Sequence, residues 1–156
     1  MIQISQFQTA TRAIQLGNAV SYIKNRSTQL MGLTSTQSEA IRYILKNYSE
    51  KSLSAANLME YLQLSQSTVT GIIQRLEEKE LIERTVSKAD TRKNIIMPTA
   101  KGLELEESLK QSAVETEAIL LDGMTKEEQE QFNYLLQKAL DNMNAAKIAG
   151  RNGNGY

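Results

Sequence analysis

The hydrophobic periodicity changes from helical to extended within residues 53–98, and this change constrains the fold more than any other feature. Within residues 65–80 the apolar positions recur at i, i+3, i+4 and i+7, the spacing of one helical face. These positions are Val69, Ile72, Ile73 and Leu76. After Glu80 the pattern alternates as in a strand, and a β-branched run from Asn94 is closed by Pro98. The pattern predicts a helix followed directly by a two-stranded hairpin.

The other face of this helix is small and hydrogen-bonding. It carries Ser67, Thr70, Gly71 and Gln74, with Thr68 and Arg75 at its edge. Short hydroxyls, an amide and a guanidinium approach base edges and phosphates closely, whereas a merely solvated face is more often filled with Lys and Glu. Taken alone, the face fits both a DNA-reading surface and an ordinary polar one.

A short helix is predicted just before this one. Ser54 is placed to cap residues 55–62, and the turn 63–65 leads to Ser65 as the next N-cap. Two short helices joined by three residues form a helix-turn-helix pattern. Upstream, Thr34 and Gln37 form a capping box at the start of a helix over about residues 35–48.

Positive charge is concentrated in the hairpin although the whole chain has 18 basic and 18 acidic residues. Residues 84–93 have a local charge of +3, and residues 98–156 have a local charge of −4. The charged hairpin residues are Arg84, Lys88, Asp90, Arg92 and Lys93. A basic patch determines where a polyanion docks, although a solvated hairpin tip explains these charges equally well. Asp90 is expected to stiffen the tip by accepting amide hydrogen bonds or by pairing with Arg75 or Arg92.

The chain contains no Cys and no His. A cysteine nucleophile, a disulfide and most zinc sites are therefore excluded, and no phosphate-binding or dinucleotide fingerprint is present. We expect no enzyme activity, catalytic residue, cofactor or metal site. No apolar run approaches the ~18 residues of a membrane span, and no signal-peptide pattern opens the chain, so a cytoplasmic location is expected.

Five short motifs, in this order and spacing, resemble the MarR family of bacterial transcriptional regulators. They are Ser67-Thr68-Val69-Thr70, Arg75-Leu76-Glu77, Leu81-Ile82-Glu83-Arg84, Asp90-Thr91-Arg92 and Thr99-Ala100-Lys101-Gly102. The resemblance covers about residues 33–102. Two positions depart from it: the family often has a basic residue in place of Gly71 and a helix-ending glycine in place of Glu80. The first departure removes a base or phosphate contact, and the second concerns the shape of the helix end.

The fold class expected is mainly α with a small β-hairpin wing, a winged helix-turn-helix flanked by dimerisation helices. The expected domains are an N-terminal dimerisation helix (1–32), the winged helix-turn-helix (33–98), C-terminal dimerisation helices (99–148) and a disordered tail (149–156). The first helix is expected over about residues 7–31 with Gly32 as its stop. A long helix capped by Thr99 is expected to run to about residue 121. The last begins at a Thr125–Glu128 capping box, and its broad apolar stripe also fits packing within its own chain.

By resemblance, the chain is expected to act as a homodimeric, sequence-specific regulator of transcription, a repressor, on a pseudo-palindromic double-stranded DNA operator. The two reading helices would lie about one DNA turn, ~34 Å, apart. The DNA-binding candidates are Ser65, Gln66, Ser67, Thr68, Thr70, Gln74, Arg75, Lys88, Arg92 and Lys93, with Asp90 structuring the wing. Ser65, Gln66 and Ser67 suit phosphate, and Thr70 and Gln74 suit base edges.

The resemblance also implies a small amphipathic or phenolic effector that binds between the dimer helices and the DNA-binding lobe. Tyr22, Arg26, Arg42 and Tyr43 are polar or aromatic groups of the right kind, but an ordinary core and surface explains them equally well. The alternative function is a dimeric winged-helix adaptor that binds protein. Salt separates the two functions, because binding through several phosphates weakens steeply as ionic strength rises.

Overall fold

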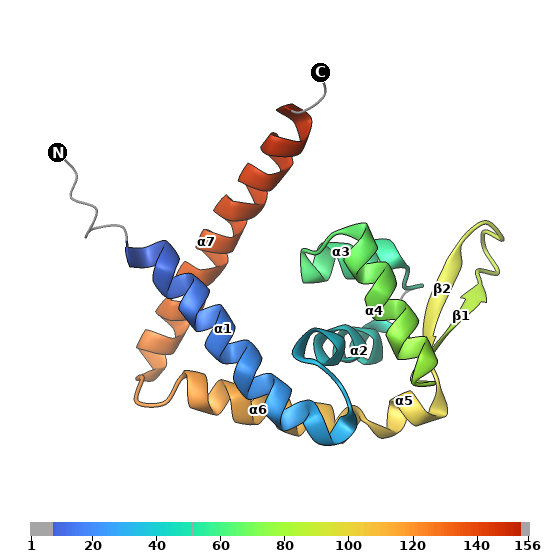
Figure 1. Ribbon diagram of the computed structural model, residues 1–156, viewed down its shortest axis with the longest axis horizontal. Coiled ribbons are helices and arrows are strands. Elements are labelled where there is room, and N and C mark those ends of the chain that lie inside the picture. Colours follow the sequence, from blue (N-terminus) through green and yellow to red (C-terminus); the bar gives the residue numbers. More distant parts are fainter. Residues whose placement is uncertain (1–7, 51, 154–156) are drawn as a thin grey trace. The chain divides into compact units, whose positions relative to one another are not determined.

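The computed structural model describes residues 8–50 and 52–153 (Figure 1). The chain divides into two compact units, one up to Glu117 and the other from Ala118 onward. No helix in the described part of the chain has the length and apolar character needed to cross a membrane.

The first unit opens with helix α1 (Gln8–Thr28), which continues into a 3₁₀ turn (Gln29–Met31). Gly32 ends this segment in the left-handed conformation, with φ of 65°, so the predicted stop is confirmed. Phe7, the expected start of the helix, lies outside the described residues. Helix α2 (Ser35–Asn47) begins at the predicted capping box, in which the Gln37 N–H donates to Thr34 Oγ1 over 3.2 Å.

Helices α3 (Ala55–Leu62) and α4 (Gln66–Glu78) form the predicted helix-turn-helix. Gln63 takes a left-handed conformation between them, and Ser65 caps α4 by accepting a hydrogen bond from the Thr68 N–H. The predicted apolar stripe of α4 is buried, with every member at most 8% exposed. One face of α4 is therefore held against the core, and the other is left for solvent or a partner.

Strands β1 (Ile82–Val86) and β2 (Asn94–Pro98) form an antiparallel hairpin in which Ile82 lies opposite Pro98. A bridge from Leu53 extends this small sheet, because the Ile96 N–H donates to the Leu53 carbonyl over 2.8 Å. The core joins α2, α3, α4 and the hairpin. Its most deeply buried large side chains are Ile41, Ile44, Leu53, Leu58, Leu76, Ile96 and Leu109. This core keeps the hairpin beside α4.

The prediction of one continuous helix after Thr99 is wrong, because the segment is divided into α5 (Ala100–Glu104) and α6 (Glu106–Leu120). At Leu105 the N–H donates to the Gly102 carbonyl three residues back, which tightens the turn. Leu105 packs on the core and Leu109 is buried in it. The tight turn thus lies where the chain is anchored to the core.

The second unit contains helix α7 (Lys126–Gly153), which follows a left-handed glycine at Gly123. The predicted capping box is present, since the Thr125 N–H donates to Glu128 Oε2 and the Glu128 N–H donates to Thr125 Oγ1. Residues 149–153, expected in a disordered tail, are helical, because a long formed helix gains one hydrogen bond for each residue added. The rest of that tail, 154–156, lies outside the described residues.

Candidate nucleic-acid interface

The N-terminal turn of α4 is exposed and rich in hydrogen-bonding groups. The Ser65 hydroxyl lies 2.9 Å from that of Thr68 and 3.2 Å from that of Ser67. The N–H groups of Gln66 and Ser67 belong to the first helical turn, where no intrahelical acceptor exists. Free amides, hydroxyls and the positive end of the helix dipole together suit a phosphate.

Farther along the same face, Glu78 holds two of the candidate residues. Gln74 Nε2 donates to Glu78 Oε1 over 3.2 Å, and Arg75 Nη1 donates to Glu78 Oε2 over 2.8 Å. The Arg75 and Glu78 side chains are 67% and 46% exposed, and exposed pairs of this kind contribute about 0–1 kcal/mol. A stronger partner can therefore replace Glu78. The sequence motifs did not single out this carboxylate, although its i+3 and i+4 spacing was visible.

The tip of the wing is organised by Ser87 and Asp90. The buried Ser87 hydroxyl accepts hydrogen bonds from the Ala89 and Asp90 N–H groups, each over 3.3 Å. Asp90 Oδ1 accepts from the Arg92 N–H over 3.1 Å, so one expected contact of Asp90 is present. Within residues 8–50 and 52–153 Asp90 forms no ion pair with Arg75 or Arg92. Sequence reasoning missed Ser87.

The tip presents its basic side chains to solvent. Lys88, Arg92 and Lys93 are all exposed. The tip is closed by backbone bonds, from the Ser87 N–H to the Lys93 carbonyl and from the Lys93 N–H to the Asp90 carbonyl. The three cations thus project from a hydrogen-bonded loop.

Arg84, counted with the basic residues of the hairpin, instead ties the wing to α4. Its Nε and Nη2 each donate to one Glu77 oxygen over 2.8 Å, a bidentate pair. This hydrogen bonding raises the pKa of Arg84 above its ordinary value. The pair fixes the base of the wing against the C-terminal half of α4.

The end of α4 is locked by the segment that follows the wing. Glu80 has φ of 58°, the conformation that favours the glycine expected there by resemblance. The Thr99 hydroxyl donates to the Glu80 carbonyl over 2.6 Å, and Lys101 Nζ donates to the Lys79 carbonyl over 2.9 Å. The residues that follow α4 are therefore hydrogen-bonded to the start of α5.

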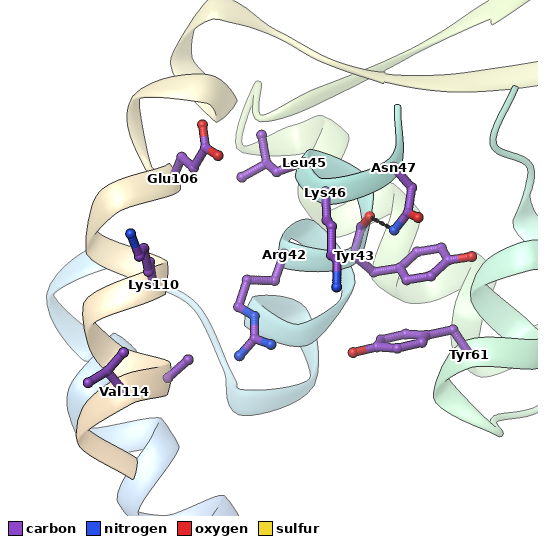
Figure 2. Close-up of a pocket in the computed structure, with 10 residues that line it drawn as sticks. Arg42, Tyr43, Leu45, Lys46, Asn47, Tyr61, Glu106, Lys110 and Val114 are labelled. Atoms are coloured by element: carbon purple, nitrogen blue, oxygen red, sulfur yellow. Dashed lines mark hydrogen bonds between the residues drawn. The ribbon is translucent and has the colours of Figure 1, made fainter. Parts of the chain in front are cut away.

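A cavity of about 460 Å³ lies among α2, α3 and α6, within the first unit (Figure 2). Arg42, Lys46 and Lys110 line it together with two tyrosines, Tyr43 and Tyr61. The two phenol rings are stacked, with centroids 4.3 Å apart and planes inclined by 22°. The cavity therefore offers an aromatic wall and three cations against one carboxylate, that of Glu106. Tyr22 and Arg26, the other two effector candidates, line a separate groove of about 420 Å³ at the end of α1.

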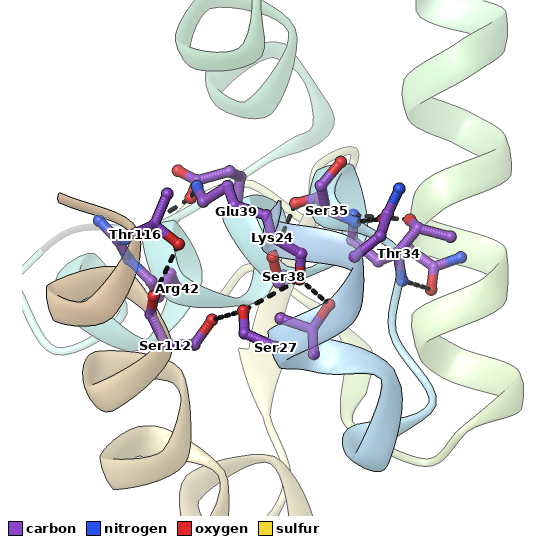
Figure 3. A network of polar contacts seen from close by, with 12 residues as sticks. Lys24, Ser27, Thr34, Ser35, Ser38, Glu39, Arg42, Ser112 and Thr116 are labelled. Carbon is purple, nitrogen blue, oxygen red and sulfur yellow. Dashed lines mark hydrogen bonds and ion pairs between the residues drawn. The ribbon is translucent and has the colours of Figure 1, made fainter. Parts of the chain in front are cut away.

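A polar network centred on Glu39 connects this cavity to α1 (Figure 3). Glu39 pairs with Lys24 of α1, accepts from Arg42 over 3.5 Å and accepts from the Tyr61 hydroxyl over 3.3 Å. Burial and the Glu39 carboxylate raise the pKa of Tyr61, so its phenol stays protonated as the donor. Residues of α1, α2 and α3 thus share one carboxylate.

A helix-turn-helix whose second helix exposes a polar face, flanked by a basic hairpin, defines a winged helix-turn-helix protein. A sequence model of the MarR family matches residues 31–93, which include both helices and most of the wing. Over these residues the chain is similar to the MarR family.

One curated relative is the HTH-type transcriptional repressor NicR of Pseudomonas putida. It is 28% identical over 88 residues, which cover 56% of this chain and 56% of the relative. The chain spans about half the length of the first curated relatives it matches.

Solved structures match over more of the chain. A DNA complex of MepR from S. aureus is 25% identical, with a TM-score of 0.80, and the match covers 87% of this chain and 98% of that one. A MarR family regulator from Listeria monocytogenes, complexed with a 26mer DNA, has a TM-score of 0.82 at 21% identity. That match covers 100% of this chain and 99% of the other, and it shows the shared fold.

Proposed function

We propose that this protein is a sequence-specific DNA-binding transcriptional regulator that acts in the cytoplasm as a homodimeric repressor and performs no catalysis. One observation carries the proposal. The exposed hydrogen-bonding face of α4 and the basic tip of the wing belong to two elements that the Arg84–Glu77 pair joins at the base of the wing. MepR, to which the chain is similar, is described in a DNA complex.

The assignment of roles follows from the reach of each group. An α-helix fits the major groove, so Thr70 and Gln74 on the exposed face of α4 address base edges. Ser65, Gln66 and Ser67 hold a phosphate at the helix N-terminus. Lys88, Arg92 and Lys93 at the wing tip reach the flanking backbone or the minor groove. Thr68 and Arg75 support the helix contacts from the edge of the face.

Dimer formation is supported by apolar side chains exposed on α1, in the 3₁₀ turn and on α7. They are Ile14, Tyr22, Leu30, Tyr134, Leu135, Leu140, Met143 and Ile148. So many exposed large apolar residues on helices at both ends of the chain favour burial against a second copy. Light scattering coupled to gel filtration tests this, and a monomer at micromolar concentration contradicts it.

DNA binding is tested by selection from random duplexes of about 30 base pairs, long enough for two half-sites one helical turn apart. Fluorescence anisotropy then compares the selected duplex with a scrambled one at two salt concentrations. We expect a pseudo-palindrome to be enriched and its affinity to fall steeply with salt. Failure to enrich any sequence refutes the proposal and favours the adaptor function.

We further propose that a small aromatic anion occupies the cavity of Figure 2 and lowers DNA affinity. The volume of about 460 Å³ is within the usual range for ligand sites, and Arg42, Lys46 and Lys110 suit a carboxylate beside the Tyr43–Tyr61 stack. A ligand carboxylate would compete with Glu39 for Arg42, and Glu39 also holds Lys24 of α1. Occupancy is thereby linked to the contact between α1 and α2.

A panel of benzoate derivatives tests this regulation. Thermal-shift measurements identify binders, and anisotropy on the selected duplex measures their effect on affinity. Arg42→Met should abolish the thermal shift while the ligand-free protein keeps its DNA affinity. A ligand that shifts the melting temperature without changing DNA affinity contradicts regulation, because coupling requires different affinities in the two states.

A further inference from the structure

Gly71 lies on the outward face of α4, in its middle turn. At 100° per residue it lies about 150° from the centre of the buried stripe formed by Val69, Ile72, Ile73 and Leu76. Gly71 is exposed, and a Cβ built on it would meet no atom within 4 Å. The outward surface of this turn of α4 is therefore bare backbone.

No contact among residues 8–50 and 52–153 explains a glycine at this position. Apart from proline, glycine is the least favourable residue inside a helix, since it loses the most backbone freedom on folding. Gly71 lies within α4, has a negative φ, and packs against no neighbour that a methyl group would displace. By contrast, Gly102 is required by close packing, because its Cβ would meet a backbone oxygen at 2.1 Å.

The side chains one turn before and one turn after Gly71 form hydrogen bonds with residues farther from it along the helix. Ser67, one turn before, lies within hydrogen-bonding distance of Ser65. Gln74 and Arg75, one turn after, both donate to Glu78. The gap at Gly71 is therefore not covered by its neighbours, and a surface placed against α4 would meet the backbone there.

We propose that Gly71 determines the sequence specificity of this protein by letting the backbone of α4 approach the floor of the major groove. The inference rests on the proposed DNA-binding function. A helix with its side chains is about 10–12 Å across and the groove is about 12 Å wide, so a side chain on the outward face of the middle turn of α4 limits the depth of insertion. Deep insertion brings Thr70 and Gln74 within reach of base edges, whereas a side chain at residue 71 holds them back.

The test compares Gly71→Ala with Gly150→Ala, a matched control on α7 that also has no atom within 4 Å of its added Cβ. Both variants should melt no lower than the parent, because alanine favours helix. On the duplex selected by the parent, Gly71→Ala should lose at least tenfold in affinity and most of its preference over scrambled DNA. Its weak binding to scrambled DNA at low salt should stay, and Gly150→Ala should bind as the parent does.

The outcomes separate this inference from the function on which it rests. If the parent selects a duplex and Gly71→Ala binds it within twofold, the role of Gly71 is overturned and DNA recognition by α4 is retained. A melting temperature of Gly71→Ala well below that of the parent also overturns it, since residue 71 would then be needed for folding. If the parent selects no duplex, both the proposed function and the proposed role of Gly71 are refuted.

Discussion

Replacing Gly102 by alanine is expected to destabilise the protein by crowding the junction between the wing and α5. The added Cβ would lie 2.1 Å from the Leu81 carbonyl oxygen and 3.1 Å from the Leu81 carbonyl carbon. A contact of 2.1 Å must lengthen by about 1.4 Å to reach the ~3.5 Å of an ordinary one. The Leu81 oxygen cannot move freely, because it accepts a hydrogen bond from the Thr99 N–H over 3.1 Å.

The size of the effect follows from three contributions. Overpacking costs about 1–3 kcal/mol, and weakening the Thr99–Leu81 hydrogen bond adds about 1 kcal/mol. The better helix propensity of alanine in α5 offsets up to about 1 kcal/mol of this destabilisation. The net destabilisation is about 2 kcal/mol, which lowers the melting temperature of a chain of this size by about 4–8 °C.

Thermal unfolding followed by circular dichroism measures this difference. Gly71→Ala is the control within the same compact unit, because alanine there meets open space and should raise the melting temperature. A Gly102→Ala protein that melts within 1 °C of the parent would refute the steric reasoning. An equal fall in the melting temperatures of Gly102→Ala and Gly71→Ala would also refute it.

Three further substitutions separate stability from recognition. Glu80→Gly should raise the melting temperature by about 2–4 °C, since φ of 58° strains a residue with a Cβ by about 1 kcal/mol; a lower melting temperature contradicts this. Arg92→Ala should weaken binding to selected and scrambled duplexes alike and reduce the salt slope by about 1, and an unchanged slope would remove Arg92 from the phosphate contacts. Gln74→Ala should leave the salt slope unchanged and relax base preference, so equal discrimination by variant and parent excludes it from base readout.

Local chemistry explains why much of the fold could be predicted from the sequence. The Thr34–Gln37 and Thr125–Glu128 capping boxes depend on groups three residues apart, and both are present. The buried stripe of α4 follows from helical spacing alone. The exposed candidates on α4 and at the wing tip follow from the same periodicity, because a face opposite the core must meet solvent or a partner.

The features that could not be predicted depend on contacts between distant parts of the chain or on the choice of rotamer. The pairing of Arg84 with Glu77 depends on where the hairpin lies against α4. The Ser87 hydroxyl becomes a buried hydrogen-bond acceptor only when the tip of the wing is folded. The tight turn at Leu105 reflects packing on the core. The cavity is lined by α2, α3 and α6, and α6 is far from the other two in sequence. The sequence therefore could not show that Arg42 and Tyr43 line this cavity whereas Tyr22 and Arg26 line another groove.

The bidentate Arg84–Glu77 pair also affects which operators a dimer of this protein would tolerate. Because the pair and the buried Ile82 tie the wing to α4, the two elements keep a fixed separation and orientation. The distance between the bases met by α4 and the groove met by the wing is then the same on every operator. A base pair inserted between the α4 and wing footprints would therefore abolish recognition of that half of the operator.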